Sequence, residues 1–130
     1  MKTPLHKPTD SELEILQVLW EKGEASVREV NDRLNEIKEN EVGYTTTLKI
    51  MQLMLEKNLV ERNTESRTHI YKATVAEDKV QGNLLSRFVK QAFRGSASKL
   101  VMQALGSHEP SKDELEEIKS LIEEIEKKKS

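Results

Sequence analysis

Three polar residues, Thr45, Lys49 and Gln52, recur at intervals of four and three residues, and Thr46 follows the first of them. On an α-helix this spacing places a hydroxyl, an ammonium group and a carboxamide on one face. In the major groove of DNA, Lys donates to guanine, Gln pairs with adenine, and the methyl group of Thr packs against that of thymine. These four residues are therefore candidates for contacts with base edges. The alternative is a polar face that only meets water.

Three further residues could contact DNA phosphates, which fix a protein on the duplex without reading its sequence. Arg28 lies in the first turn of a predicted helix, Tyr44 directly precedes the helix that carries the base-edge candidates, and Arg67 lies at the tip of a predicted hairpin. For Arg28, an ion pair with Asp32 four residues on is an equally good interpretation.

The segment from Ser96 to Lys99 matches the Ser-x-x-Lys pattern of serine β-lactamases. The other two segments of that pattern, Ser-Asp-Asn and Lys-Thr-Gly, are absent, and Ser96 follows a glycine, where a helix cap is expected. The three histidines lie far apart in the sequence, without the spacing of metal ligands. We therefore predict that the chain is not an enzyme and that it needs no metal or cofactor.

The base-edge candidates must be held by helices, and three amphipathic helices are predicted in the first half of the chain, at about residues 9–23, 26–37 and 45–57. Capping boxes open the first two, because Thr9 and Ser26 are each followed three residues later by Glu. Gly23 ends the first helix, and Asn58 provides a left-handed cap for the third. Trp20 lies on the apolar stripe of the first helix and is expected in the core.

After the third helix the apolar pattern changes from helical to alternating. Residues 59–62 and 69–72 are predicted strands, and the polar segment 63–68 between them is the tip of a hairpin. Three helices followed by a hairpin is the order of a winged helix-turn-helix, in which the third helix enters the major groove. We predict a DNA-binding domain of this fold over residues 1–74, within a mainly α chain.

Residues 75–130 are predicted to form a helical dimerisation domain. Gly95 and Gly106 are expected to end its first two helices, and a capping box at Ser111 opens the third. About 55 residues in three helices cannot bury these apolar stripes alone, so pairing with a second copy is expected. The residues expected at this contact are Leu84, Leu85, Phe88, Leu100, Val101, Leu105, Leu115, Ile118, Leu121, Ile122 and Ile125.

The amino acid composition limits the fold class, the chemistry and the location that we expect for the chain. Charged residues make up 34% of the chain and aromatic residues 4%, which is typical of a helical protein, and the absence of cysteine excludes disulfides and thiol catalysis. Without a signal peptide or an apolar run of about 18 residues, we expect a cytoplasmic protein outside membranes. Residues 1–73 hold 11 Lys/Arg against 13 Asp/Glu, whereas residues 79–108 hold five Lys/Arg and no acid.

Six segments, taken in their order and spacing, resemble the penicillinase repressor family. They are residues 8–20 (PTDSELEILQVLW), 25–30 (ASVREV), 43–48 (GYTTTL), 56–60 (EKNLV), 69–71 (HIY) and 93–96 (FRGS). The resemblance implies a homodimeric winged-helix repressor that binds a palindromic operator and blocks transcription.

The resemblance is less complete where the family senses its signals. Members that respond to β-lactams are cut by a sensor protease at an Asn-Phe bond, and the corresponding pair here is Gln103-Ala104. Whether a sensor protease is a partner of this chain therefore stays open. Copper-responsive members end in a cluster of cysteines, which this chain lacks.

The predicted function is thus sequence-specific repression by a homodimer on double-stranded DNA with an inverted-repeat operator. The alternative is a winged-helix module that binds another protein and no DNA, which the weakly acidic first half permits. The salt dependence of binding distinguishes the repressor from the protein-binding module, because binding through several phosphates weakens steeply as the salt concentration rises.

Overall fold

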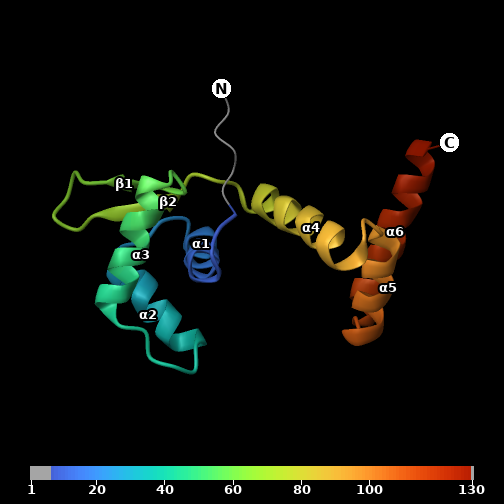
Figure 1. Cartoon of the computed structure of the whole chain (residues 1–130), viewed down its shortest axis with the longest axis horizontal. Helices are drawn as coiled ribbons and strands as arrows, with labels where there is room; N and C mark the ends of the chain where they lie inside the picture. The colour runs from blue at the N-terminus through green and yellow to red at the C-terminus, as the bar shows by residue number, and fades with distance from the viewer. Residues whose placement is uncertain (1–6, 130) are drawn as a thin grey trace. The chain divides into compact units, whose positions relative to one another are not determined.

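The computed structural model describes residues 7–129 and is mainly helical, with a single hairpin, as the sequence predicts (Figure 1). In chain order the elements are α1 (Asp10–Lys22), α2 (Val27–Ile37), α3 (Tyr44–Glu56), β1 (Val60–Asn63), β2 (Ile70–Ala73), α4 (Glu77–Phe93), α5 (Ala97–Ser107) and α6 (Lys112–Lys129). Contacts divide the chain into two compact units, one up to Leu84 and one from Leu85 onward. This division falls inside α4, where Val80 is buried; the predicted domain boundary after residue 74 stays a prediction.

Both predicted capping boxes at the start of α1 and α2 are present. The backbone N–H of Glu12 donates to the Thr9 hydroxyl at 3.1 Å, and the Glu12 carboxylate accepts from the Thr9 N–H at 2.9 Å. Ser26 and Glu29 form the same pair of hydrogen bonds. Gly23 ends α1 with a φ of 86°, a conformation that L-residues with a side chain rarely adopt.

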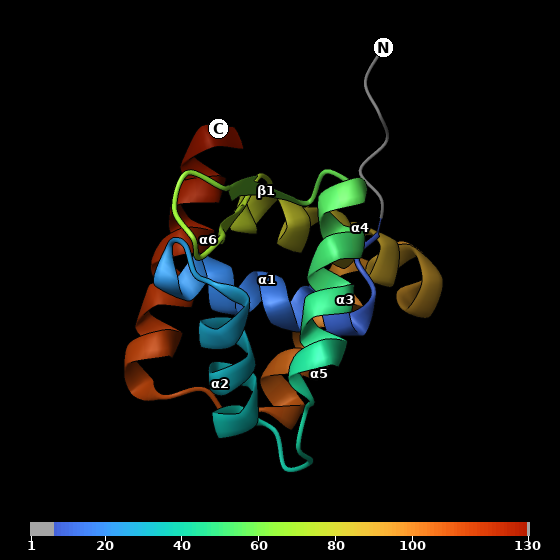
Figure 2. The same cartoon turned by 90° about the vertical axis from the view of Figure 1, so that its left-hand side faces the viewer.

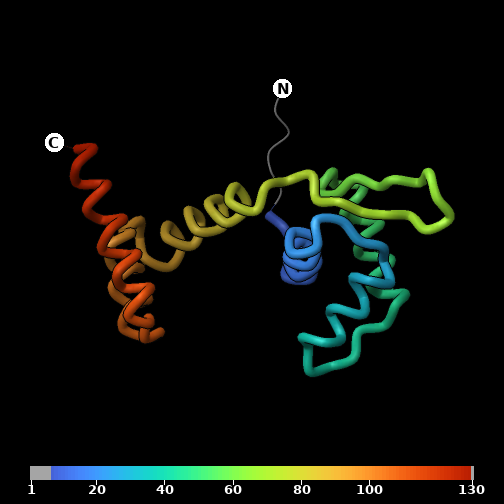
Figure 3. Tube along the Cα trace, turned by 180° about the vertical axis from the view of Figure 1, so that it is seen from behind, coloured from blue at the N-terminus to red at the C-terminus, as the bar shows by residue number. Residues whose placement is uncertain are grey.

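The strands begin one residue later than predicted. Asn58 takes the expected left-handed conformation, with a φ of 63°. Leu59, which was expected to start the first strand, instead completes the end of α3, because its N–H donates to the Met54 carbonyl at 2.9 Å. The strands then pair antiparallel from Val60 opposite Ala73 onward, and Figure 3 follows them out to the tip of the hairpin and back.

A second correction concerns Gly106, which does not end a helix. It lies inside α5, which continues to Ser107. The helix ends where the N–H of His108 donates to the Ala104 carbonyl at 3.1 Å, two residues before Pro110. A glycine disfavours a helix by only about 1 kcal/mol relative to Ala. Its presence alone therefore did not fix the boundary.

The core of the first unit is built from α1, α2, α3 and the hairpin (Figure 2). Its most buried large side chains are Tyr71, Ile15, Leu16, Leu19, Met51, Met54 and Val30. Trp20 packs against this core, and its indole N–H donates to the Val75 carbonyl at 3.0 Å. The indole therefore holds the segment between β2 and α4 against α1.

The connection between α1 and α2 is joined to the hairpin by backbone hydrogen bonds. Ala25 and Tyr71 form an antiparallel bridge, in which Ala25 N–H donates to Tyr71 O at 2.9 Å and Tyr71 N–H to Ala25 O at 2.8 Å. Both residues are buried. The bridge sets the hairpin beside the N-terminus of α2.

The second unit has little core of its own. Neither α5 nor α6 contains a buried residue, and in α4 only Val80 is buried, a residue of the first unit. The rings of Phe88 and Phe93 meet edge to face, with centroids 5.7 Å apart. No helix in residues 7–129 is long and apolar enough to cross a membrane.

Candidate nucleic-acid interface

Two asparagines of α2 fix the turn that leads into α3. Asn31 is buried, and its side-chain amide donates to the Val42 carbonyl and to the Thr47 hydroxyl, both at 2.9 Å. The side chain of Asn35 accepts from the Val42 N–H at 2.7 Å and donates to the Val42 carbonyl at 3.1 Å. The start of α3 is therefore held to α2 by side-chain hydrogen bonds as well as by packing.

One face of α3 is buried and the opposite face is exposed. The buried side chains Thr47, Met51 and Met54 follow one another at intervals of four and three residues. The four base-edge candidates are exposed: Thr45, Thr46, Lys49 and Gln52. The structure thus presents a polar face of the kind that can enter a DNA groove, while the role of each residue stays a prediction.

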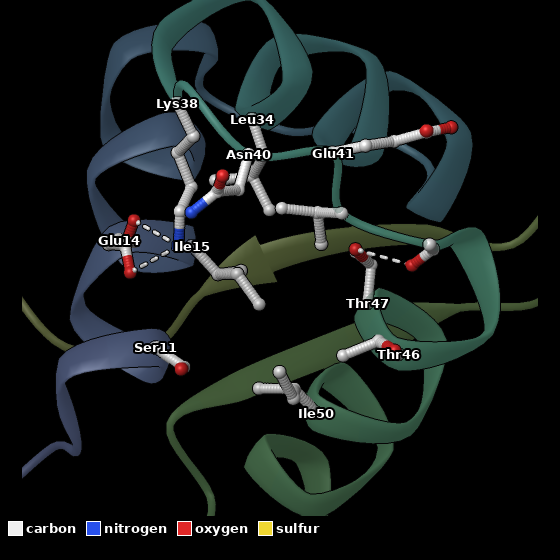
Figure 4. A pocket seen from close by; sticks show the side chains of 12 residues that line it. Ser11, Glu14, Ile15, Leu34, Lys38, Asn40, Glu41, Thr46, Thr47 and Ile50 are labelled. Carbon is white, nitrogen blue, oxygen red and sulfur yellow. Dashed lines mark hydrogen bonds and ion pairs between the residues drawn. The ribbon is translucent and has the colours of Figure 1, made fainter.

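Thr46 lies at the edge of this exposed face, beside a pocket of about 300 Å³ (Figure 4). The pocket is lined by α1, the end of α2, the turn and the first half of α3. Thr46 and Ile50 line it from α3, and an ion pair between Lys38 Nζ and Glu14 Oε2, 3.0 Å apart, lies on another side. Lys49 is not part of its lining. Thr46 is therefore the one base-edge candidate that lines this pocket.

The three phosphate candidates line one groove. Arg28, Tyr44 and Arg67 border a hollow of about 640 Å³ between the start of α2, the start of α3 and the hairpin. The Arg28 guanidinium lies over the Tyr44 ring, with its central carbon 5.0 Å from the ring centroid, a cation–π contact. In the described chain Arg28 forms no ion pair with Asp32 within 4.0 Å. Arg28 is exposed and lines the groove, so a ligand of the groove could reach it.

The charges of this groove are mixed. Glu29 and Asp32 line it together with the two arginines. Hydrogen bonds from the Ser26 backbone N–H and hydroxyl keep the pKa of Glu29 below its ordinary value, so this carboxylate is ionised at neutral pH. The groove therefore lacks a strong excess of positive charge. An anion would be held there by directed hydrogen bonds from the arginines and the Tyr44 hydroxyl.

Sequence reasoning missed further residues of this surface. Thr68 and His69 line the groove beside Arg67; their places at the predicted hairpin tip and at the start of a predicted strand gave no sign that they lie near α2 and α3. Leu53 on α3 is also 43% exposed. The signal that could have found it is its distance of four residues from Lys49, which places both on one helix face.

The residues predicted at the dimer contact lie on α4, α5 and α6, and most of them are exposed in the single chain. Leu84, Leu100 and Ile118 are half-buried. The others are between 36% and 55% exposed: Leu85, Phe88, Val101, Leu105, Leu115, Leu121, Ile122 and Ile125. An exposed apolar surface of this extent in a small helical unit typically marks a contact with another protein.

The sequence model of a family described as penicillinase repressor matches residues 8–124. A penicillinase repressor from Staphylococcus aureus is 21% identical over 118 residues, which cover 91% of this chain and 92% of the relative.

Solved structures show the same fold. The DNA-binding domain of the repressor BlaI superposes with a TM-score of 0.50 at 22% identity, covering 59% of this chain and 90% of that domain. RosR of H. salinarum superposes with a TM-score of 0.52 at 18% identity, covering 89% and 91% of the two chains. The predicted winged helix-turn-helix is therefore confirmed as the fold of the first unit.

Proposed function

Because the chain belongs to the penicillinase repressor family, we propose that it is a repressor that binds an inverted-repeat DNA operator as a homodimer. The observation that carries the proposal is the arrangement of the first unit. The exposed polar face of α3 borders the groove that contains Arg28, Tyr44 and Arg67. A helix that enters the major groove would have phosphate-binding groups beside it. With chromosomal DNA as its ligand, the protein would act in the cytoplasm.

In this proposal each part of the first unit has its own contact with DNA. Thr45, Thr46, Lys49 and Gln52 would meet base edges, where Lys and Gln distinguish guanine and adenine by their hydrogen bonds. Arg28, Tyr44 and Arg67 would hold phosphates on the flanking backbone and set the depth of α3 in the groove. The first unit is weakly acidic overall. Its attraction to DNA would therefore depend on these few local contacts.

The second unit would supply the two-fold symmetry. Its exposed apolar side chains on α4, α5 and α6 would be covered by the same residues of a second copy. Two α3 helices would then lie one DNA turn apart, about 34 Å or a multiple of it, so the operator would be an inverted repeat.

The proposal is tested by selecting bound duplexes from a random pool with the whole 130-residue chain, followed by a salt titration on the selected sequence. We expect an enriched inverted repeat, and a fall in affinity of about 0.9 log units per phosphate contact for each tenfold rise in salt. A scrambled duplex of equal length is the control. If the folded protein enriches no sequence, the proposal is wrong, and a module that binds only another protein becomes the better explanation.

A further inference from the structure

Leu53 is an apolar side chain on an otherwise polar face. In the described part of the first unit, the large hydrophobic residues that are exposed are Ile37, Tyr44 and Leu53, at 54%, 41% and 43%. Tyr44 lies under the Arg28 guanidinium, and Ile37 is the last residue of α2. Leu53 is different, because it lies within α3 on the face that carries the base-edge candidates.

The helix geometry places Leu53 next to two of these candidates. It follows Lys49 by four residues and Thr46 by seven, so the three side chains lie one above the other along α3. The next residue, Met54, is fully buried and belongs to the core. Leu53 is absent both from the core and from the half-buried hydrophobic residues that pack on it. Packing within the first unit therefore gives no reason for a leucine at this position.

DNA offers an apolar partner on this side of the molecule. The C5-methyl group of thymine is the apolar group that base pairs present in the major groove, and leucine has no side-chain donor or acceptor with which to read anything else there. We propose that Leu53 is a further specificity-determining residue, which packs against a thymine methyl group in each half of the operator. The inference rests on the proposed function, since it requires α3 to lie in the major groove.

Replacing thymine by uracil tests this contact directly, because uracil lacks only the methyl group and keeps every hydrogen-bonding group. In the selected operator each thymine of one half-site is replaced in turn, and the Kd is measured at one fixed salt concentration. Burying one methyl group is worth about 0.8 kcal/mol, which corresponds to about fourfold in Kd. The wild-type protein should lose about fourfold at one thymine position.

Two substitutions at Leu53 and one matched control complete the experiment. Leu53→Ala should bind the thymine and uracil operators equally at that position, whereas Leu53→Met, which keeps an apolar side chain, should retain part of the difference. Ile37→Ala removes the other large aliphatic side chain that is exposed in the described part of the unit, at the end of α2, and should respond to uracil as the wild type does. Both positions are on the surface, so thermal unfolding should show that each of the three variants folds.

The outcomes separate the two hypotheses. If every variant binds the operator with specificity but wild type and Leu53→Ala respond to uracil alike at all positions, the role of Leu53 is wrong and the repressor function stands. If the wild-type protein selects no sequence at all, the proposed function is wrong, and the role of Leu53 is overturned with it.

Discussion

Individual side chains of the first unit differ in what they could contribute to binding DNA. Lys49 lies within the exposed face of α3, whereas Arg67 lies in the groove beside α2, together with Arg28. If α3 lies in the major groove of DNA, the Lys49 ammonium group could distinguish one base from another. The Arg67 guanidinium would instead meet a phosphate, which every DNA sequence has. The two residues should therefore affect specificity in different ways.

Lys49→Ala should weaken binding to the operator more than binding to random duplex. The difference between the two binding free energies should shrink by about 1–3 kcal/mol. Arg67→Ala should weaken both by a similar factor and should lower the salt slope by about 0.9. Competition titrations with the two duplexes at several salt concentrations measure both quantities. Each variant removes one positive charge, so each controls for the other. Equal losses on both duplexes for Lys49→Ala would exclude it as a base-reading residue.

Glu12 is a charged side chain with a structural role. Its side chain is 4% exposed and accepts a hydrogen bond from Lys57 Nζ at 2.8 Å, which ties the start of α1 to the end of α3. Burial alone would raise the pKa of Glu12, but the hydrogen bonds from Lys57 and Thr9 outweigh burial and hold it below its ordinary value. An acid with a lowered pKa in the folded state stabilises the fold above its unfolded pKa.

This stabilisation should begin to fall when the pH drops below about 4.5, the ordinary pKa of a glutamate side chain. It should be lost once the pH has dropped through the lower pKa that Glu12 has in the folded state. Glu12→Gln should reduce the free energy of unfolding by about 1–3 kcal/mol at pH 7 and by less at pH 3. Urea unfolding between pH 3 and pH 7 checks this. Glu14→Gln, which breaks a more exposed ion pair, is the control and should change stability little. A constant difference between wild type and Glu12→Gln across this range would contradict the prediction.

At the scale of elements, the turn between α2 and α3 determines how α3 is presented. Asn31 is buried and bonds to both Val42 and Thr47, whereas Asn35 is exposed and bonds to Val42 and to Asn31 itself. Losing a buried donor leaves its partners without a hydrogen bond, while water replaces an exposed one. The two asparagines are therefore a matched pair for testing the turn.

Asn31→Ala should lower the free energy of unfolding by about 1–3 kcal/mol, and Asn35→Ala by less than about 1.5 kcal/mol. Urea unfolding of the two variants measures the difference. Asn31→Ala should also weaken operator binding, because α3 loses its fixed start. A larger loss for Asn35→Ala would show that the buried bonds of Asn31 do not govern this turn.

Patterns among neighbouring residues predicted the helices well, whereas contacts between residues far apart in the chain could not be predicted from the sequence. The capping boxes at Thr9 and Ser26 join residues three apart, so the amino acid pattern alone identified them. The bridge between Ala25 and Tyr71 joins backbone groups of distant segments. Because nearly every residue type has the same backbone donor and acceptor, such hydrogen bonds cannot be predicted from the amino acids at these positions. The exposed face of α3 followed from helix periodicity, but the grouping of Arg28 with Arg67 required the tertiary structure.

At the scale of the whole molecule, the two units bury their apolar residues differently. The first unit has a closed core of side chains from three helices and the hairpin. In the second, Leu121 and Ile122 are more than half exposed, at 55% and 51%. If a second copy covers them, the stability of this unit depends on protein concentration. The pairing of two α3 helices on one operator then depends on protein concentration as well.

Leu121→Asp should break the proposed dimer, because it places a charge on the apolar face of α6. Sedimentation should then give the mass of a single chain, and operator affinity should fall by about two to four orders of magnitude as the two half-sites are bound independently. Ser120→Asp adds the same charge at the neighbouring, non-apolar position and should leave the dimer intact. A dimeric mass for Leu121→Asp would contradict the assignment of this face.

The indole hydrogen bond of Trp20 gives the protein a built-in optical reporter. Trp20 is the single tryptophan of the chain, and its indole N–H donates to the carbonyl of Val75, in the segment that joins the hairpin to α4. Indole fluorescence depends on hydrogen bonding and exposure to water. Any event that pulls this segment away from α1 would therefore shift the emission spectrum of the unlabelled protein, so its rate could be followed by stopped flow without attaching a dye.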